Sequence, residues 1–205
     1  MSGLKLNNSS HSMSVDAVSK KIYVKYMVCL RDKMILNSVL NQQGVKCTIS
    51  AHGAIELFEG ISAEQIYDLK MDLIKHGLIL LDDENSLLID KIINTIIETI
   101  HYTDKLPKIN FSDLISTFTG SEQESILKIF SDVMGMSVLH FIIINKIERV
   151  KELLLYEDIP LKEIAELLNY KNKHYLIAQF KKVTGLTPSY YMKLKEERLK
   201  LLKTD

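Results

Sequence analysis

The feature that most constrains this chain is a change of sequence pattern near residue 84. From there to the C-terminus, apolar residues recur three and four positions apart, the spacing of one face of an α-helix, and breaks containing Gly, Pro or Asn interrupt them. The pattern predicts a long helix that ends before Pro107 and then helices at 111–119, 122–134, 138–156, 161–168, 173–184 and 189–202. The long helix is expected to bury Leu87, Leu88, Ile92, Ile96 and Ile100. Residues 84–205 should therefore form an all-α domain.

Residues 20–83 alternate between strand-like and helix-like segments. Apolar, β-rich runs predict strands at 22–29, 45–50, 54–58 and 78–81, the middle two joined by a hairpin at His52-Gly53. Helices are expected at 30–43, ended by Gly44, and from Ser62 to Gly77, where Ser62 and Gln65 make a capping box. The apolar face of the first of these helices should comprise Leu30, Met34, Leu36, Val39 and Leu40.

These two patterns define the expected fold class. The order β-α-β-β-α-β over 20–83 is that of a ferredoxin-like domain, so the chain is expected to be an α+β ferredoxin-like domain followed by the all-α domain of 84–205. Residues 1–19, rich in Ser and Asn and without periodicity, are expected to be a flexible arm.

Composition narrows the class of protein. The formal net charge is zero, so nucleic-acid binding would need a local concentration of charge. Cys29 and Cys47 are too few for a disulfide scaffold; two reduced thiols are favoured over a single bridge. We find no signal peptide and no apolar run of the roughly 20 residues that a membrane helix needs, and expect a cytoplasmic protein with no membrane partner. A nucleophile elbow and a phosphate-binding glycine loop are also missing from the sequence, so we expect neither an enzyme nor a cofactor.

The segment 161–184 has the residue pattern of a helix-turn-helix. Leu161, Ile164, Ala165 and Leu168 form the apolar face of its first helix, and Tyr175, Leu176 and Phe180 are the expected core residues of its second. Between the helices, Asn169 is one of the few non-glycine residues that tolerate the positive φ that such a turn requires.

Charge distinguishes this pair of helices from the preceding pair. Between Asn169 and Lys195 there is no acidic residue, and the basic ones are Lys171, Lys173, Lys181, Lys182, Lys193 and Lys195. In 111–135 the only basic residue is Lys128, against the acids Asp113, Glu122, Glu124 and Asp132. Because phosphate neutralisation dominates DNA affinity, we expect the second pair to bind double-stranded DNA. The alternative is that these lysines are only the solvated face of a structural helical bundle.

A helix-turn-helix reads bases with the N-terminal part of its second helix. Lys173 and His174 can reach guanine acceptors, and Asn172 can reach an adenine edge or a phosphate. Ile177 can contact a thymine methyl group, whereas Lys181 and Lys182 are better placed for phosphate. The candidate DNA-binding residues are Lys171, Asn172, Lys173, His174, Ile177, Ala178, Lys181 and Lys182.

The C-terminal domain contains three short motifs, Glu163-Ile-Ala165, Phe180-Lys-Lys182 and Gly185-Leu-Thr-Pro-Ser-Tyr190, with Gly120, Phe130, Gly135 and Phe141 upstream. In these residues and their spacing the domain resembles the AraC/XylS family of transcription regulators, most strongly in the three motifs. It implies two helix-turn-helix units, here about 111–134 and 161–184, joined by a linker helix at 138–156. It also implies promoter regulation without catalysis. The positions that would read bases in the first unit are Gln123, Glu124, Leu127 and Lys128, where the acids favour a weak or non-contacting unit.

The N-terminal domain resembles the heavy-metal-associated ferredoxin-like fold in the run Met27-Val-Cys29 and in Gly44-Val45. That fold binds copper(I) or similar ions with a C-x-x-C loop, but here Asp32 stands at the second cysteine position. A metal-responsive switch through Cys29 is thus the alternative function. The preferred interpretation of 20–83 is a dimerisation or protein-contact module that gives a homodimer, and an unidentified small effector is the remaining alternative.

Overall fold

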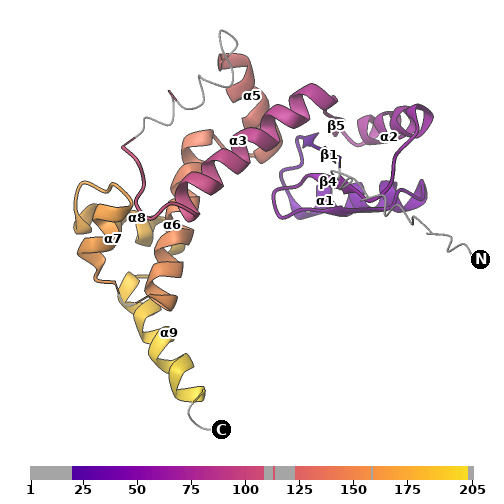
Figure 1. The fold of residues 1–205 in the computed structure, drawn as a ribbon. Coiled ribbons are helices and arrows are strands. Elements are labelled where there is room, and N and C mark those ends of the chain that lie inside the picture. Colours follow the sequence, from indigo (N-terminus) through magenta and orange to yellow (C-terminus); the bar gives the residue numbers. More distant parts are fainter. Residues whose placement is uncertain (1–19, 109–112, 114–122, 158, 203–205) are drawn as a thin grey trace, which may run out of the picture.

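The computed structural model describes residues 20–108, 113, 123–157 and 159–202. A small unit of strands and helices stands at one end of an elongated molecule, and the helices nearest the C-terminus stand at the other (Figure 1). The long helix α3 (Asp83–His101) leads from the first end toward the second. The helices that follow are α5 (Gln123–Met134), α6 (Val138–Tyr156), α7 (Leu161–Leu167), α8 (Lys173–Thr184) and α9 (Pro188–Leu201). The expected arm at 1–19, Gly120 and, apart from Asp113, the expected helix at 111–119 lie outside the described residues.

The strands of the N-terminal unit are short and pair antiparallel in two small sheets. One sheet has the order β1-β4-β3 and the other pairs β2 with β5. The strands are β1 (Lys21–Ile22), β2 (Val24–Lys25), β3 (Cys47–Ile49), β4 (Ile55–Leu57) and β5 (Ile79–Leu80). The expected hairpin is confirmed, with Ile49 opposite Ile55 in the register. The element order is as expected when β1 and β2 are counted as halves of one strand, while the ferredoxin-like arrangement stays a prediction.

The expected strand over 22–29 is wrong in its extent. It is divided at Tyr23, whose backbone N–H donates to Ser86 Oγ at 3.2 Å and whose carbonyl accepts from the Leu81 N–H at 2.8 Å. The first half of the expected strand, β1, therefore pairs with β4, and the second half, β2, pairs with β5. The strand then ends before Tyr26, which has a φ of 68°, a left-handed conformation incompatible with a continuing strand.

The two helices of this unit are α1 (Leu30–Gln42) and α2 (Ala63–Lys75). The Ser62–Gln65 capping box is present, and Gly44 has the positive φ of a residue that follows a helix end. Leu36, Val39 and Leu40 are buried as expected in one apolar cluster with β1, β2, β4 and α2. Leu30 and Met34 are exposed instead. At about 100° per residue, both positions lie about 80° or more around the helix from each of the three buried residues.

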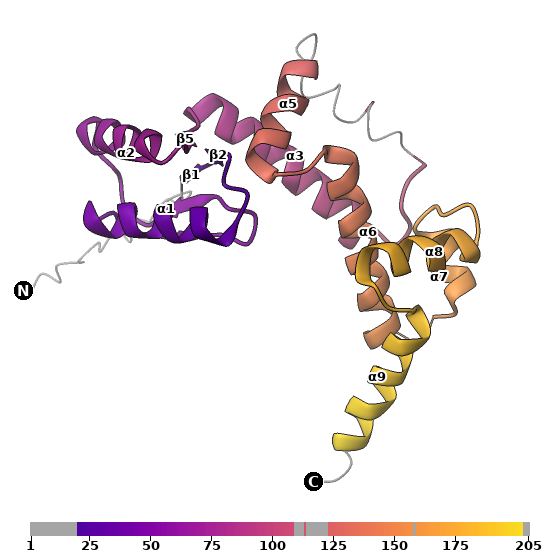
Figure 2. The ribbon, with the colours of Figure 1, turned by 180° about the vertical axis from the view of Figure 1, so that it is seen from behind.

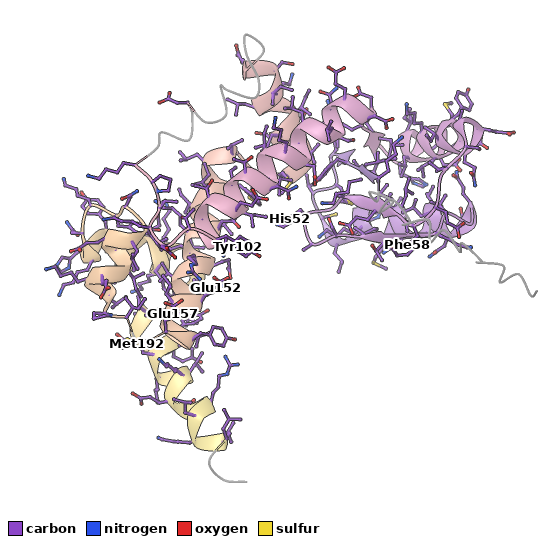
Figure 3. All side chains as sticks on the ribbon, viewed as in Figure 1. His52, Phe58, Tyr102, Glu152, Glu157 and Met192 are labelled. Carbon is purple, nitrogen blue, oxygen red and sulfur yellow. The ribbon has the colours of Figure 1, made fainter. Side chains whose placement is uncertain are left out.

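A second apolar cluster joins the N-terminal unit to the helical region. Tyr23 and Ala54 pack there with α3, with Phe130 of α5 and with Phe141 of α6. His52 lies at this junction (Figure 3), with its ring edge-on to Phe141 at a centroid distance of 5.7 Å. On α3 the buried apolar residues are Ile89, Ile92, Ile93, Ile96 and Ile100. The expectation was therefore wrong for Leu87, which is exposed, while Leu88 is half-buried at the edge of the cluster.

Helices α5 and α6 follow each other with a sharp change of direction. The break lies at Gly135, and the Ser137 hydroxyl caps α6 by accepting from the His140 N–H at 3.2 Å. Across the described ranges 20–108, 123–157 and 159–202, no single helix has the length and apolarity needed to cross a membrane. Glu124–Met134 and Val138–Tyr156 satisfy that criterion only as a pair, with a bend of 56° between them.

Candidate nucleic-acid interface

Helix α6 carries the pair α7 and α8 on a third apolar cluster. Ile147, Val150, Leu153 and Leu154 of α6 pack there against both helices. From α7, Ile164 and Ala165 are fully buried, as the sequence predicts, and the small Ala165 allows close approach. From α8, Leu176 and Phe180 are also fully buried. One face of α8 is thereby fixed against the body of the domain and the other is left free.

The turn between α7 and α8 has the expected geometry. Asn169 adopts a φ of 52°, which confirms the positive φ predicted for this position. Its side-chain amide also donates to the carbonyls of Leu106 at 2.7 Å and Pro107 at 3.1 Å. The sequence pattern did not predict this second role, because the partners lie more than 60 residues upstream. Asn169 thus sets the turn and ties it to the segment that follows α3.

The start of α8 is held by Asn172. Its Oδ1 accepts hydrogen bonds from the backbone N–H groups of His174 and Tyr175, at 2.9 and 3.1 Å, as an N-cap residue does. A bidentate contact with an adenine edge needs both the oxygen and the nitrogen of an asparagine amide. With the oxygen engaged in the cap, only the amide N–H groups remain to donate, which favours the phosphate alternative over the adenine alternative.

The face of α8 that points away from the cluster is exposed and basic. Ile177 is half-buried at its edge. The exposed candidate residues are Lys171, Asn172, Lys173, His174, Ala178, Lys181 and Lys182. In the part of the chain that the structure describes, no carboxylate lies within ion-pairing distance of any of these lysines. The lysines of α9 are less free, since Lys193 lies 3.8 Å from Glu197 and Lys195 Nζ donates to the Glu157 carbonyl at 3.2 Å.

Tyr175 was expected in the core, and this expectation is wrong. Its side chain is 56% exposed. At about 100° per residue, Tyr175 lies roughly 140° around the helix from Phe180, whereas Leu176 lies only about 40° from it. The helical period therefore already indicated that Tyr175 is not on the buried face. The Lys171 ammonium lies 5.6 Å from the centroid of the Tyr175 ring, in cation–π range. Tyr175 therefore joins the exposed surface at the start of α8.

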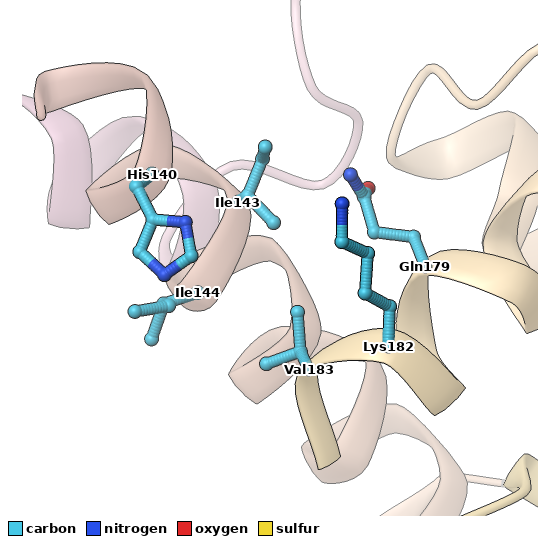
Figure 4. A pocket seen from close by; sticks show the side chains of 6 residues that line it. All are labelled: His140, Ile143, Ile144, Gln179, Lys182 and Val183. Atoms are coloured by element: carbon cyan, nitrogen blue, oxygen red, sulfur yellow. The ribbon is translucent and has the colours of Figure 1, made fainter. Parts of the chain in front are cut away.

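A pocket of about 270 Å³ lies beside this surface, between α6 and α8 (Figure 4). Ile143, Ile144 and Val183 give it apolar walls, and His140, Gln179 and Lys182 supply polar groups. Of these residues, only Lys182 was predicted from the sequence to contact DNA. Through Lys182, the cationic surface of α8 thus reaches a pocket that α6 also lines.

Helix α5, the predicted second helix of the first unit, is more extensively buried against the rest of the molecule than α8 is. Ile126, Phe130 and Val133 are buried, and the Asp132 carbonyl accepts from the Tyr26 N–H at 2.7 Å. Of the expected reading positions, Glu124 and Lys128 are exposed and Leu127 is half-buried, while the side chain of Gln123 lies outside the described residues. Only the beginning of α5 is therefore available to a ligand.

The cysteine region of the N-terminal unit has a structural arrangement of its own. Asp32 Oδ2 accepts from the backbone N–H groups of Val28 and Cys29, each at 2.9 Å, so the carboxylate caps α1. Cys29 is exposed, whereas Cys47 on β3 is half-buried and burial raises the pKa of its thiol. Nowhere in the described residues do three or more His, Cys, Asp or Glu side chains gather as a metal site would require. Metal sensing through Cys29 thus stays a prediction that this geometry does not support.

The helical region is similar in sequence to known proteins. Residues 115–194 match the family described as helix-turn-helix domain. A curated relative, the uncharacterized HTH-type transcriptional regulator YtdP of Bacillus subtilis (strain 168), is 28% identical over 158 residues, which are 69% of this chain and 20% of the relative. The chain thus spans about a fifth of the length of that protein.

Several solved structures are similar to part of this chain at low sequence identity. The C-terminal domain of AraT, a response regulator from Geobacillus stearothermophilus, is 22% identical with a TM-score of 0.45, over 52% of this chain and 84% of that one. The DNA-binding domain of AdpA in complex with a target DNA is 15% identical with a TM-score of 0.46, over 54% and 94%. An AraC-type regulator from Chromobacterium violaceum is 11% identical with a TM-score of 0.47, over 56% and 96%.

Proposed function

We propose that this chain, in which residues 115–194 are a helix-turn-helix domain of the AraC type, is a DNA-binding transcription regulator that reads the major groove mainly with α8. The observation that carries the proposal is the free face of α8. It combines exposed lysines without acidic partners in the described residues with a rigid attachment of the opposite face to α6 and α7. A helix held on one side and cationic on the other is what insertion into a groove requires.

The residues of this face divide into two roles. Lys173 and His174 at the start of α8 are the proposed guanine contacts, with Ile177 and Ala178 one turn later against thymine methyl groups or sugar. Phosphate contacts are assigned to Lys171, the amide of Asn172, Lys181 and Lys182, which surround the reading positions. Phosphate contacts fix the register of a protein on the duplex, and base contacts choose the sequence.

The first unit is proposed to contribute less. Glu124 is exposed at the start of α5, where a carboxylate repels phosphate, and the end of α5 packs against the N-terminal unit. Glu124 can accept from a cytosine amino group, so a weak base contact is the most that we assign to it. The N-terminal unit itself we infer to be a non-catalytic contact module.

In vitro selection from a random duplex library tests this function. The expected result is enrichment of a defined sequence, with a tighter dissociation constant for selected than for random duplex at the same salt concentration. The Lys173→Ala, His174→Ala double variant should give no enrichment. Its matched control is Lys33→Ala, His76→Ala, which removes one exposed lysine and one exposed histidine from the N-terminal unit. Absence of DNA binding by the unmodified chain at low salt would refute the proposal.

A further inference from the structure

Helix α2 carries an apolar face that no other described part of the chain covers. Leu69 and Leu73 on one side of the helix are fully buried in the cluster of the N-terminal unit. On the other side, Tyr67, Met71 and Ile74 are 63%, 43% and 55% exposed. Their spacing of four and three residues aligns them along one stripe of the helix. A surface helix needs one apolar stripe to pack against the core of its own domain. A second, exposed apolar stripe such as that of α2 indicates a surface that binds another molecule.

The charges beside this stripe are arranged with opposite signs at its two ends. Glu64 and Asp68 lie near the start of α2 and Lys75 lies at its end, all exposed. At about 100° per residue, these three positions fall within roughly 40° of each other around the helix, next to Met71 and away from Leu73. Lys75 also contacts Asp72 within the chain, at 2.7 Å. One flank of the stripe is therefore acidic at its first half and basic at its last residue.

This arrangement is complementary to itself when the helix direction is reversed. In an antiparallel pair related by a two-fold axis, the same flank of each helix meets its copy, so that residue i contacts j and j contacts i. With the axis near Met71, Asp68 of one copy faces Lys75 of the other and Tyr67 faces Ile74. Two equivalent ion pairs would then border one continuous apolar seam.

We propose that α2 is a self-association surface, which pairs antiparallel with α2 of a second copy of this chain. The place of α2 in the fold allows it, because α2 lies at the outer end of the N-terminal unit, remote from α7, α8 and α9 (Figures 1 and 2). The proposal does not rest on DNA binding, although a pair of chains joined in this way would present two α8 helices.

Measurement of molar mass against protein concentration by sedimentation equilibrium tests the apolar part of the surface. The unmodified chain should change from monomer to dimer as its concentration rises. Met71→Lys should raise the dissociation constant of the dimer by about tenfold or more, because it places a charge at the centre of the seam. The matched control is Met34→Lys on α1, which is also exposed and is not part of the stripe. Circular dichroism verifies that both variants keep their helices.

A charge exchange tests the two-fold geometry. Asp68→Lys alone and Lys75→Glu alone should each weaken the dimer, because each brings like charges together in both symmetric contacts. An equal mixture of the two variants should form a heterodimer, since both of its contacts then join a lysine to an acid. The double variant carrying both changes should regain self-association.

Three results would overturn the inference. One is a chain that remains monomeric at every concentration. Another is a dimer that Met71→Lys leaves unchanged while Met34→Lys disrupts it. The third is the failure of the mixed charge variants to associate more strongly than each alone. A failure of DNA binding is a separate result, since none of these measurements includes DNA.

Discussion

The two helices α5 and α8 are predicted to occupy the same place in successive helix-turn-helix units, but the fold packs them differently. Helix α5 is buried through Phe130 and Val133, and hydrogen bonding to Asp132 joins it to the N-terminal unit. Helix α8 uses Leu176 and Phe180 to attach to α6 and exposes its remaining surface. Two helices with the same predicted role therefore differ in how much of their surface is exposed.

Charge follows the same division. At α5 the Lys25 ammonium lies 4.0 Å from the Asp132 carboxylate, an ion pair within the chain. At α8 the lysines have no such partners in the described residues and stay available for phosphate. These differences support our proposal that α5 acts mainly as a joint between the two parts of the molecule and α8 as the DNA-reading element.

The largest effect should come from removing the aromatic side chains that fix each helix. Phe130→Ala and Phe180→Ala each delete a fully buried ring and should each lower the free energy of unfolding by about 3–5 kcal/mol. Urea denaturation measures this decrease. If α5 is a joint, the fraction of Phe130→Ala that stays folded should bind DNA like the unmodified chain, and folded Phe180→Ala should bind weakly. Equal weakening of DNA binding in both variants would contradict the proposed difference in role between α5 and α8.

Next in size is the removal of base-reading side chains from α8. Lys173→Ala with His174→Ala should reduce discrimination between sequences by about 1–3 kcal/mol for each side chain that reads a base, without a change in stability. Competition between selected and random duplex in a gel-shift assay measures it. The corresponding change in α5, Glu124→Ala with Lys128→Ala, serves as control and should have a much smaller effect. If the α5 variant discriminated between selected and random duplex less well than the α8 variant, α5 would be the main reading helix instead of α8.

A smaller effect is expected from the phosphate-binding lysines. Lys181→Ala should weaken binding to all sequences alike and reduce the slope of log K against log salt by about one unit. Titrations of selected and random duplex at several salt concentrations measure the slope. Lys162→Ala on α7, an exposed lysine outside the acid-free stretch, is the control. Weakening confined to the selected sequence would assign Lys181 to base reading instead.

The smallest effect concerns the joint at acid pH. Burial, and then the charge of Lys21, lower the pKa of His52, which Asp90 partly opposes. The unfolded chain therefore binds this proton at higher pH than the folded chain, so stability rises with pH across the interval between the two pKa values. The contribution of His52 is complete above about pH 6.5 and is lost as pH falls through the folded pKa.

Lowering the pH below about 6.5 should accordingly increase hydrogen exchange around β4, α5 and the start of α6 more than in α8. His52→Gln should remove this dependence, and the exposed His76→Gln should retain it. Equal acceleration of exchange in α5 and α8 would show that His52 has no local role at the junction.

The sequence predicted the helices well because their signals are local. Residues 138–156 and 173–184 are helical over the expected ranges, and Asn169 has the expected φ. Two features were not predicted, because they depend on contacts between residues that are distant in the sequence. Tyr23 divides the first strand through bonds to residues about 60 positions away, and nothing near Asp132 indicates that Tyr26 would bind its carbonyl. Tyr175 is different, since a strict helical period would have placed it outside the core.

The most direct test of α8 as the DNA-reading element is a hydroxyl-radical footprint on the selected duplex. We predict strong protection over one major-groove segment, which disappears with Lys173→Ala, His174→Ala and persists with Glu124→Ala, Lys128→Ala. Any protection of a second segment should be weak. A footprint that the α8 variant leaves intact and the α5 variant abolishes would contradict the division of roles between the two helices.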